Sequence, residues 1–491
     1  MESLLLSVAG GVLGLLLAIW TDRVLLGFLP PETVALNLST TPDFRILLFA
    51  SAVSLLTGLI FGLVPALEST KPDVAPTLKD TTGGVVGGGA HVRVRKALVA
   101  MQVMLSLLLL IGAGLFIRSL RNLRDMGPGF TIGNLAAFEV DPSLNGYNSD
   151  RSKLFYRQLT AELNAIPGVR SVGVASVRIL QDNESDSWLT IEGYHPTPTE
   201  TPDAYINWIG PGYFATLGVP ILAGRDFKEQ DTQTLQHSDQ PDDTEPRVVM
   251  VNEKFAKQFF GSAENAVGRH AGFGIDPGTK ADMEIIGVIK NIKYTNLRDE
   301  VPIQLFEPYM ATDSVSGMTV YLRTALNPNQ LFSAVRSKVR GLDANLPVYG
   351  MRTMDDQISN SLLIERLIAS LSAVFGFLAT LLAVIGLYGV MAYTVARRTR
   401  EIGIRMALGA FQGDVIWMVM REVLLLVCIG IGAGLAAIGL SRLVQTQLYG
   451  ITGQDPITIA FAGLLLGAVA CAAGYSGIAG QPYRCHAGAA V

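Results

Sequence analysis

Long apolar runs lie towards both ends of the chain, and a long polar stretch separates two groups of them. A helix needs roughly 20 mainly apolar residues to cross a bilayer, and each run is close to that length. The pattern predicts six membrane-spanning helices, over Leu4–Leu29, Ile46–Leu67, Leu98–Ile117, Leu367–Thr394, Val415–Leu440 and Ile457–Tyr475.

The first apolar run has the position of a secretory signal. However, it is preceded by Glu2 and by no Lys or Arg, and no small-residue cleavage site follows it. A signal peptide has a basic start and such a cleavage site. We therefore predict that this run is a membrane helix in the finished protein.

Positive charge is distributed unevenly between the predicted loops. The loop from Pro30 to Asp43 contains no Lys or Arg, and the loop from Ser441 to Pro456 contains only Arg442. Two other loops are basic, because they contain Lys71, Lys79, Arg93, Arg95 and Lys96 in one case and Arg397, Arg398, Arg400 and Arg405 in the other. Short basic loops face the cytoplasm. Both termini are therefore predicted inside, and the long polar stretch outside.

The polar stretch alternates helix and strand signals and predicts an external α+β domain in two lobes. Helical periodicity covers Arg151–Ile166, Glu253–Phe260 and Asn329–Gly341. Short apolar or alternating runs predict strands over Val169–Val177, Pro246–Val251, Glu284–Ile289 and Met318–Arg323. The acidic segment Glu229–Glu245 reads as a surface insertion.

Composition agrees with a membrane protein. The chain is 49% hydrophobic and 16% charged, with a mean hydropathy of +0.37, which is too apolar for an ordinary soluble protein. Basic residues do not cluster with aromatic residues, so no nucleic-acid partner is expected. None of the three cysteines lies in the polar stretch, and no disulfide framework is implied there.

The sequence lacks the usual signatures of catalysis. The five histidines are scattered, and neither a Gly-x-Ser-x-Gly elbow nor a His-Glu-x-x-His motif occurs. The glycine-rich segment Gly83–Gly89 has no Gly-Lys-Ser/Thr ending, so it predicts a linker and not a phosphate loop. We expect no catalytic residue, no cofactor and no metal site. Gln102 and Ser106 are expected to serve helix packing.

An internal repeat relates the first two predicted spans to the last two. Glu2–Leu6 resembles Glu422–Leu426, and the same register aligns Gly10, Gly14 and Leu15 with Gly430, Gly434 and Leu435. After a small shift, Asp43, Phe49, Ala50 and Gly62 align with Asp455, Phe461, Ala462 and Gly474. Apolar helices share Leu and Gly by chance, but ordered matches in both helices favour a duplication.

A basic segment between the fourth and fifth predicted spans, residues 396–410, has the pattern of a short amphipathic helix. Ile402, Met406 and Gly409 fall on one side of that helix, and the arginines fall largely on another. One interpretation is a solvated loop that anchors the spans. The other is a cytoplasmic surface that contacts a soluble partner.

The string Arg-Arg-x-Arg-Glu-Ile-Gly-Ile-Arg-x-Ala-Leu-Gly-Ala in this segment closely resembles the cytoplasmic loop of FtsX/MacB-type permeases of ABC transporters. Segments Phe116–Leu123, Pro128–Phe130, Pro211–Gly218 and Gly224–Phe227 also resemble pieces of that family. The resemblance implies that the loop docks on a separate ATPase. Contact would come from Arg397, Arg398, Arg400, Glu401 and Arg405, with Gly403 and Gly409 allowing close approach.

The family unit is one span, a large external domain and three further spans, and residues 96–475 resemble that whole unit. Residues 1–80 then resemble the last two spans of an earlier unit, as in tandem permeases common in acidobacteria. The expected domains are 1–80 (two spans of a truncated first unit), 81–96 (basic cytoplasmic linker), 97–118 (one span), 119–361 (external domain), 362–475 (three spans, with a coupling loop at 395–413) and 476–491 (tail).

The tail departs from the family. The first copy retains the family's ending as Pro65-Ala66, Asp73 and Leu78-Lys79, but the second copy does not. Codons can be chosen for Tyr483–Val491 that, when read in a frame shifted by one base, encode the Asp and the Leu-Arg of the family's ending. We infer a frameshift after Tyr475, so that the tail is aberrant.

The resemblance implies a permease subunit in a bacterial inner membrane, with its large domain in the periplasm. Its partners would be a separate ABC ATPase, a second permease unit, membrane lipid and, in some family members, a periplasmic adaptor. ATP hydrolysis by the partner would move the periplasmic domain for export or extraction of substrate. Two alternatives remain open, which are a membrane sensor or scaffold without an ATPase and an inactive gene fragment.

Overall fold

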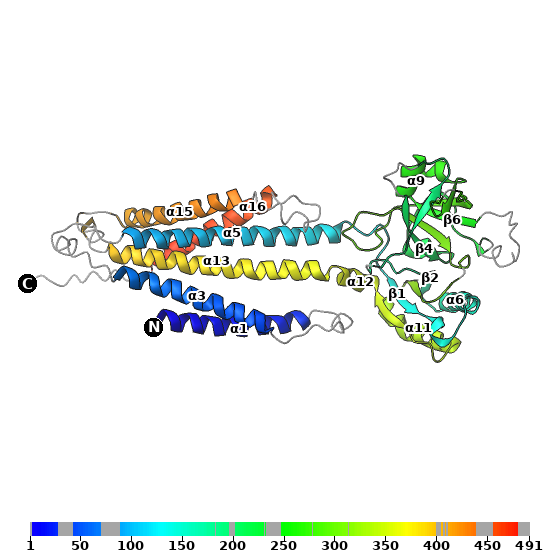
Figure 1. Ribbon diagram of the computed structural model, residues 1–491, viewed down its shortest axis with the longest axis horizontal. Helices are drawn as coiled ribbons and strands as arrows, with labels where there is room; N and C mark the ends of the chain where they lie inside the picture. Colours follow the sequence, from blue (N-terminus) through cyan, green and yellow to red (C-terminus); the bar gives the residue numbers. More distant parts are fainter. Residues whose placement is uncertain are drawn as a thin grey trace, which may run out of the picture. The chain divides into compact units, whose positions relative to one another are not determined.

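The computed structural model describes residues 2–27, 43–69, 89–181, 183–195, 202–229, 231, 247–276, 278–312, 314–398, 404–405, 408, 411–437 and 455–479. The chain divides into two compact units (Figure 1). One unit is helical and consists of Met1–Leu120 and Leu363–Val491. The other, Arg121–Leu362, contains all the described strands.

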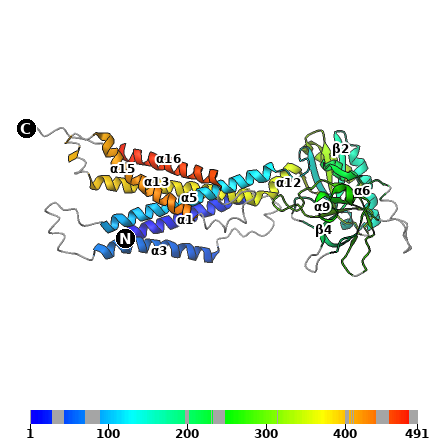
Figure 2. The ribbon, with the colours of Figure 1, turned by 90° about the horizontal axis from the view of Figure 1, so that it is seen from above.

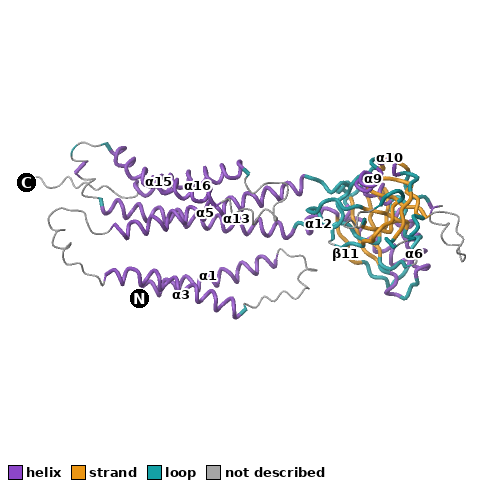
Figure 3. The backbone as a smooth tube through the Cα atoms, turned by 45° about the horizontal axis from the view of Figure 1, so that its top comes forward, coloured by secondary structure: helices purple, strands orange, loops and turns teal. Residues whose placement is uncertain are grey.

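Six long helices form the described part of the helical unit (Figure 3). They are α1 (Glu2–Gly27), α3 (Phe44–Ser69), α5 (Gly89–Asp125), α13 (Leu363–Arg397), α15 (Gln412–Ala437) and α16 (Pro456–Ala479). Each covers most of one predicted span. Within the described residues, only Lys96–Asp125 and Leu363–Val395 are both long and apolar enough to cross a membrane, and shorter apolar stretches occur in α1, α3 and α16.

Helix α5 packs against α13, α15 and α16 through two buried clusters. In one cluster, Val99 and Val103 of α5 meet residues of the other three helices, which are Ala383, Leu387, Met391, Val395, Val423, Val427 and Ala470. In the other, α5 meets Ala462 and Leu466 of α16. The Ser106 hydroxyl, fully buried, lies 2.8 Å from the carbonyl oxygens of both Gln102 and Ala379. Ser106 therefore serves helix packing, as predicted.

Helices α1 and α3 pack against each other as a pair (Figure 3). The Ser54 hydroxyl of α3 donates a hydrogen bond of 2.7 Å to the carbonyl oxygen of Ser7 in α1. A Cβ atom on Gly11 would lie 2.8 Å from the same Ser54 oxygen, so the two helices approach closely here.

The external unit is built on one connected set of eleven strands, which order as β11-β1-β10-β2-β4-β3-β7-β8-β6-β9, with β5 paired to β8. The strands are β1 (Leu135–Val140), β2 (Val169–Ala175), β3 (Asp186–Ile191), β4 (Asp203–Ile209), β5 (Ile221–Gly224), β6 (Arg247–Asn252), β7 (His270–Phe273), β8 (Met283–Ile289), β9 (Gln304–Pro308), β10 (Met318–Thr324) and β11 (Tyr349–Thr353). Most pairs are antiparallel, but β4 with β9 and β6 with β8 are parallel.

Helices cover the strands at two separate places (Figure 1), and Figure 2 shows the same unit from above. The described part of this unit also contains the end of α5, a 3-10 turn at Pro142–Asn145 and six helices. They are α6 (Ser149–Asn164), α7 (Tyr213–Leu217), α9 (Glu253–Phe260), α10 (Ala263–Ala266), α11 (Pro328–Leu342) and α12 (Met354–Ser361). One core lies between α6, α11 and strands β1, β2 and β10. A second core lies between α9 and strands β3, β4, β6, β7, β8 and β9. The two lobes predicted from sequence therefore correspond to two cores on one set of strands.

Each helix and strand that the sequence predicts for the external domain is present in the structure. The three helices appear as α6, α9 and α11, and the four strands as β2, β6, β8 and β10, with ends that differ by a few residues. The remaining strands of the described part are four to seven residues long, and their patterns are too short to separate them from loops. Nearly all of the predicted insertion Glu229–Glu245 lies outside the described residues.

Candidate functional site

The basic segment between α13 and α15 is described only at a few positions. Helix α13 continues to Arg397, and the backbone N–H of Arg398 lies within 3.2 Å of the carbonyl oxygens of Thr394 and Val395. The side chains of Arg398 and Arg405 are exposed. The other predicted contact residues have side chains outside the described part of the chain, namely Arg397, Arg400, Glu401, Gly403 and Gly409.

The described part of this segment is helical. Ile404 and Arg405 have helical backbone, and the N–H of Leu408 donates to the carbonyl oxygen of Ile404 at 3.0 Å. That four-residue spacing is the hydrogen bond of an α-helix. The predicted apolar side of the helix, made of Ile402, Met406 and Gly409, lies outside the described residues.

Large apolar side chains are exposed beside the arginines. The exposed fractions are 54% for Ile404, 83% for Leu408, 81% for Phe411 and 63% for Trp417. Scattered exposed apolar residues are common, but apolar residues grouped within a short basic segment, as Ile404, Leu408 and Phe411 are, are typical of a contact surface. Trp417 lies beyond that segment, in α15. Leu408 and Phe411 were not among the contact residues predicted from the sequence, although their place next to the run of arginines was the available signal.

Arg405 connects the segment to α15. Its guanidinium Nη1 lies 3.1 Å from the Sδ atom of Met418. Met418 also lines a hollow of about 510 Å³ with Trp417, Arg421, Glu422 and Leu425. Glu422 forms an ion pair with Lys96 of α5. Arg405 thus links the segment to α15, and the Glu422–Lys96 ion pair links α15 to α5.

The glycines of the family motif Pro211–Gly218 delimit α7. Gly212 (φ +76°) precedes this helix and Gly218 (φ +69°) ends it, and both lie in the left-handed region that favours glycine. Tyr213 and Phe214 are fully buried. The buried aromatic side chains of this motif therefore stabilise the domain.

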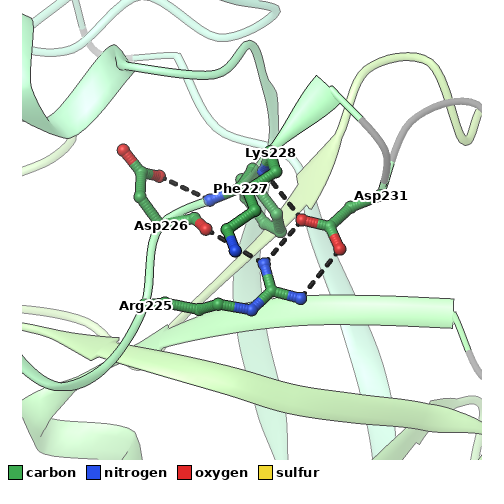
Figure 4. Close-up of polar contacts among 5 residues, drawn as sticks. All are labelled: Arg225, Asp226, Phe227, Lys228 and Asp231. Carbon is green, nitrogen blue, oxygen red and sulfur yellow. Dashed lines mark hydrogen bonds and ion pairs between the residues drawn. The ribbon is translucent and has the colours of Figure 1, made fainter.

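The second motif, Gly224–Phe227, forms a tight turn after β5 (Figure 4). Gly224 has φ +77°, and a Cβ atom there would lie 2.1 Å from the carbonyl oxygen of Ile286. Arg225 binds both carboxylate oxygens of Asp231, at 2.6 and 2.8 Å. The hydrogen bonds from Arg225 are the main reason that the pKa of Asp231 is lowered.

Asp226 in this turn is more buried than Asp231. Burial raises its pKa, although the backbone N–H groups of Phe227 and Gly212 stabilise the carboxylate. The N–H of Phe227 lies 2.8 Å from Oδ1 of Asp226 (Figure 4). The charged groups of Arg225, Asp226 and Asp231 are thus held by hydrogen bonds within this turn, which stabilise its conformation.

Two hollows lie on the external unit. One, of about 490 Å³, is lined in part by Arg157, Asn164 and Tyr309, and the other, of about 240 Å³, by residues that include Glu139 and Arg178. Burial raises the pKa of Tyr309 to about 12, which keeps its hydroxyl neutral. Among the described residues, no three His, Cys, Asp or Glu side chains are grouped as a metal site would require.

Comparison with known proteins identifies both parts of the chain. Residues 97–338 match the model of the MacB-like periplasmic core domain, and residues 373–483 match that of the FtsX-like permease C-terminal domain. The macrolide export ATP-binding/permease protein MacB of Neisseria gonorrhoeae is 27% identical over 280 residues, which are 54% of this chain. The uncharacterized ABC transporter permease YknZ of Bacillus subtilis is 26% identical over 327 residues, 64% of this chain and 72% of that protein.

The chain spans only 39% of the length of this MacB protein. A crystal structure of the periplasmic region of MacB from Actinobacillus actinomycetemcomitans aligns at 18% identity with 49% of this chain and 95% of that chain, with a TM-score of 0.31. A score this low adds nothing to the assignment.

The fold and the matched domains define a membrane protein with a large periplasmic domain. More specifically, the chain belongs to the FtsX/MacB-type ABC transporter permeases.

Proposed function

We propose that this chain is the permease subunit of an ABC-type transporter and works with a separate ATPase. The observation that supports this most strongly is the segment at 395–413. It has exposed arginines at 398 and 405 and exposed apolar side chains at 404, 408 and 411, which together suit a protein contact. Arg397, Arg400 and Glu401 would join them, with Gly403 and Gly409 allowing close approach.

Transmission would run along α13. This helix is continuous over 35 residues, from Leu363 at the edge of the external unit to Arg397 at the basic segment. A helix without a break moves as a rod, so a displacement at one end reaches the other. ATP binding and hydrolysis in the partner would thus move the periplasmic domain, which captures or pushes substrate for export or extraction.

The topology belongs to the same proposal. Six spans would place both termini in the cytoplasm of a bacterial cell and residues 119–361 in the periplasm, with the domain boundaries expected from sequence. Residues 1–80 would be the last two spans of a first FtsX-like unit, and a second permease unit would complete the transporter. Lipid surrounds the spans, and a periplasmic adaptor is compatible with the family.

The test is recovery of ATPase activity with the permease. A tagged chain is purified in mild detergent from membranes that also contain the transporter ATPase of the same cell, and ATP hydrolysis in the eluate is measured. We expect Arg398→Glu combined with Arg405→Glu to reduce the recovered activity by about tenfold, because each reverses a charge at the contact. The matched control is Arg124→Glu, which changes an exposed arginine in the last turn of α5, outside the basic segment.

Equal recovery with the double variant and the control would contradict the proposed contact. A wild-type chain that brings down no ATPase, but whose periplasmic domain binds a ligand, would favour the sensor or scaffold. A chain with neither property would favour the inactive fragment.

A further inference from the structure

The larger hollow on the external unit, of about 490 Å³, lies where the two cores of this unit meet. Val172 and Val174 line it from β2, which belongs to the core covered by α6. Gly210 and Tyr309 line it from positions that directly follow β4 and β9, two strands of the second core that pair in parallel. Ligands commonly bind at the boundary between two packed bodies and at the carboxyl ends of parallel strands. The position of the hollow therefore suits a binding site.

Tyr309 presents a polar group to this hollow. Its side chain is 4% exposed, and its ring is held against Gly210, because a Cβ atom there would lie 3.4 Å from Cε1 of Tyr309. The charges of Arg157 and Glu229, which also line the hollow, act on the Tyr309 hydroxyl, so the hydroxyl faces the hollow. Burial raises the pKa of Tyr309 to about 12, so this hydroxyl is a hydrogen-bond donor at neutral pH. A buried tyrosine hydroxyl usually has a partner, but no described group forms a hydrogen bond with this one.

A neighbouring tyrosine has the hydrogen bonds that a structural hydroxyl makes. The rings of Tyr156 and Tyr309 are in edge-to-face contact, with centroids 6.3 Å apart. The Tyr156 hydroxyl lies 2.7 Å from the carbonyl oxygens of Val140 and Ser316. It also accepts a hydrogen bond of 2.9 Å from the N–H of Met318. The Tyr309 hydroxyl has no described contact of this kind, so it is available to a ligand.

Arg157 adds a cation to the same hollow. It lies on α6, its side chain is exposed, and no described group forms an ion pair or a hydrogen bond with its guanidinium. Arginine binds a carboxylate through two parallel hydrogen bonds. Among the described residues that line the hollow, Glu229 is the other charged one, so the lining has no net charge. An anionic group would therefore be held by direct contact with Arg157 and Tyr309.

The hollow also has an apolar side. Val172, Val174 and Met310 line it, and all three are buried members of the core covered by α6. An aliphatic group that packs against them would leave water, which is favourable. The lining thus combines donors for an anion with a surface for an aliphatic group.

We propose that this hollow, the Arg157–Tyr309 site, binds a carboxylate attached to an aliphatic group. The carboxylate would accept hydrogen bonds from the guanidinium of Arg157 and the hydroxyl of Tyr309. The aliphatic group would cover Val172, Val174 and Met310. A small carboxylic acid has this chemistry, and so does the C-terminus of a peptide that ends in an aliphatic residue. The inference goes beyond the proposed function, because it requires no ATPase.

The experiment is a calorimetric titration of the full-length chain in lipid nanodiscs. The probes are hexanoate and N-acetyl-leucyl-leucine, which represent the two sources, and the controls are hexanamide and N-acetyl-leucyl-leucinamide, which lack the charge. We expect binding of an acid, and binding about tenfold weaker for its amide, because the charge-assisted hydrogen bonds are lost. The acid that binds more tightly identifies the source of the carboxylate. No binding of either acid, or equal binding of an acid and its amide, would overturn the proposal.

Tyr309→Phe separates a binding role from a structural one. It should weaken binding of the tighter acid by about fivefold, as expected for one lost hydrogen bond. It should leave the thermal unfolding midpoint unaltered, because the hydroxyl has no described partner. The matched control Tyr156→Phe loses three hydrogen bonds, so it should lower the midpoint and leave the affinity unaltered. A lower midpoint with unaltered affinity in Tyr309→Phe would overturn the proposal.

Two changes of charge should act in opposite directions. Arg157→Gln should weaken binding of the tighter acid by about tenfold. Glu229→Gln should strengthen it by about threefold, because a negative charge leaves the lining. The matched control is Arg336→Gln, at an exposed arginine of α11 that does not line the hollow, and it should leave the affinity unaltered. Equal affinities of Arg157→Gln and Arg336→Gln, or weaker binding in Glu229→Gln, would contradict the proposal.

None of these readouts involves the ATPase. Failure of the Arg157–Tyr309 site is therefore separable from failure of the proposed contact at residues 395–413.

Discussion

The helix pairs α1–α3 and α15–α16 have related sequences but different surroundings. Gly430 and Gly434 lie against α5, whereas Gly10 and Gly14 have open space beside them. Asp455 binds Arg118, whereas Asp43 has no described cation. The difference teaches that related sequences do not fix what packs against a helix pair, because the helix that covers it comes from elsewhere in the fold.

The largest expected effect separates the two glycine positions. Gly430→Leu should destabilise the packing of α5 against α15 by about 3 kcal/mol, since the new side chain would overlap Val103 and the backbone of Ala100. Gly10→Leu should cost little in the same chain. The measurement is the thermal unfolding midpoint of the purified full-length proteins, followed by the loss of helical circular dichroism. Equal midpoints for the two variants would show that the open space at Gly10 is filled in the native protein.

A smaller effect separates the two aspartates. Asp455→Asn keeps an acceptor for the N–H of Thr458 but removes the charge that binds Arg118, and should cost about 1 kcal/mol. Asp43→Asn should have no measurable cost, because Asn caps a helix as well as Asp does. The same unfolding assay applies, with Arg118→Gln as a control that should match Asp455→Asn. A loss in Asp43→Asn as large as in Asp455→Asn would argue that both carboxylates are paired.

The external unit offers a carboxylate–arginine pair away from the membrane. Asp231→Asn should lower the stability of this unit at pH 7 by about 0.5–1 kcal/mol, a modest value because Arg225 is partly exposed. The pKa of Asp231 is lower in the folded protein than in the unfolded chain, where it is about 3.9. The ionised carboxylate therefore stabilises the fold fully above the unfolded pKa. This stabilisation is lost as the pH falls through the folded pKa. Protease resistance of the external unit in right-side-out vesicles should therefore differ between variant and wild type at pH 7, and the difference should shrink at about pH 3. A difference that persists undiminished at low pH would count against the ion pair.

The smallest effect concerns the serines that join helices. Ser106→Ala should cost about 0.6 kcal/mol, since one interhelical hydrogen bond to the carbonyl of Ala379 is lost. Ser54→Ala, which removes the bond to Ser7, should cost a similar amount within the other pair. Unfolding midpoints of both variants test this. A much larger cost for Ser106→Ala would mean that hydrogen bonding, and not close packing, distinguishes the two regions.

Much of the external fold could be predicted from local pattern, but its strand pairing could not. The amphipathic helices α6 and α11 and the apolar strands β2 and β10 follow from periodicity within each segment. The parallel pairing of β4 with β9 joins Tyr205 to Gln304, and no local pattern specifies it. Short segments such as β5 and β7 become strands because they pair with neighbouring strands, since their own few residues do not specify an extended conformation.

The docking role of the basic segment stays a prediction. The arginine string drew attention to Arg398 and Arg405, and both are exposed. The exposed Leu408 and Phe411 were missed, because an apolar residue is expected to be buried and only a structure reports that it is not.

By itself, the sequence determined the helical segments, the alternation of helices and strands in the external unit, the repeat and the family. These features depend on residue spacing within short segments, and spacing is preserved in the linear chain. Only the tertiary structure decided which repeat positions are covered. Arg118 and Asp455 are 337 positions apart, and Gly430 meets α5 only after the chain has passed through the whole external unit. Whether a residue is buried depends on what packs against it. Glycines at corresponding positions can therefore be covered by a neighbouring helix in one pair and exposed in the other.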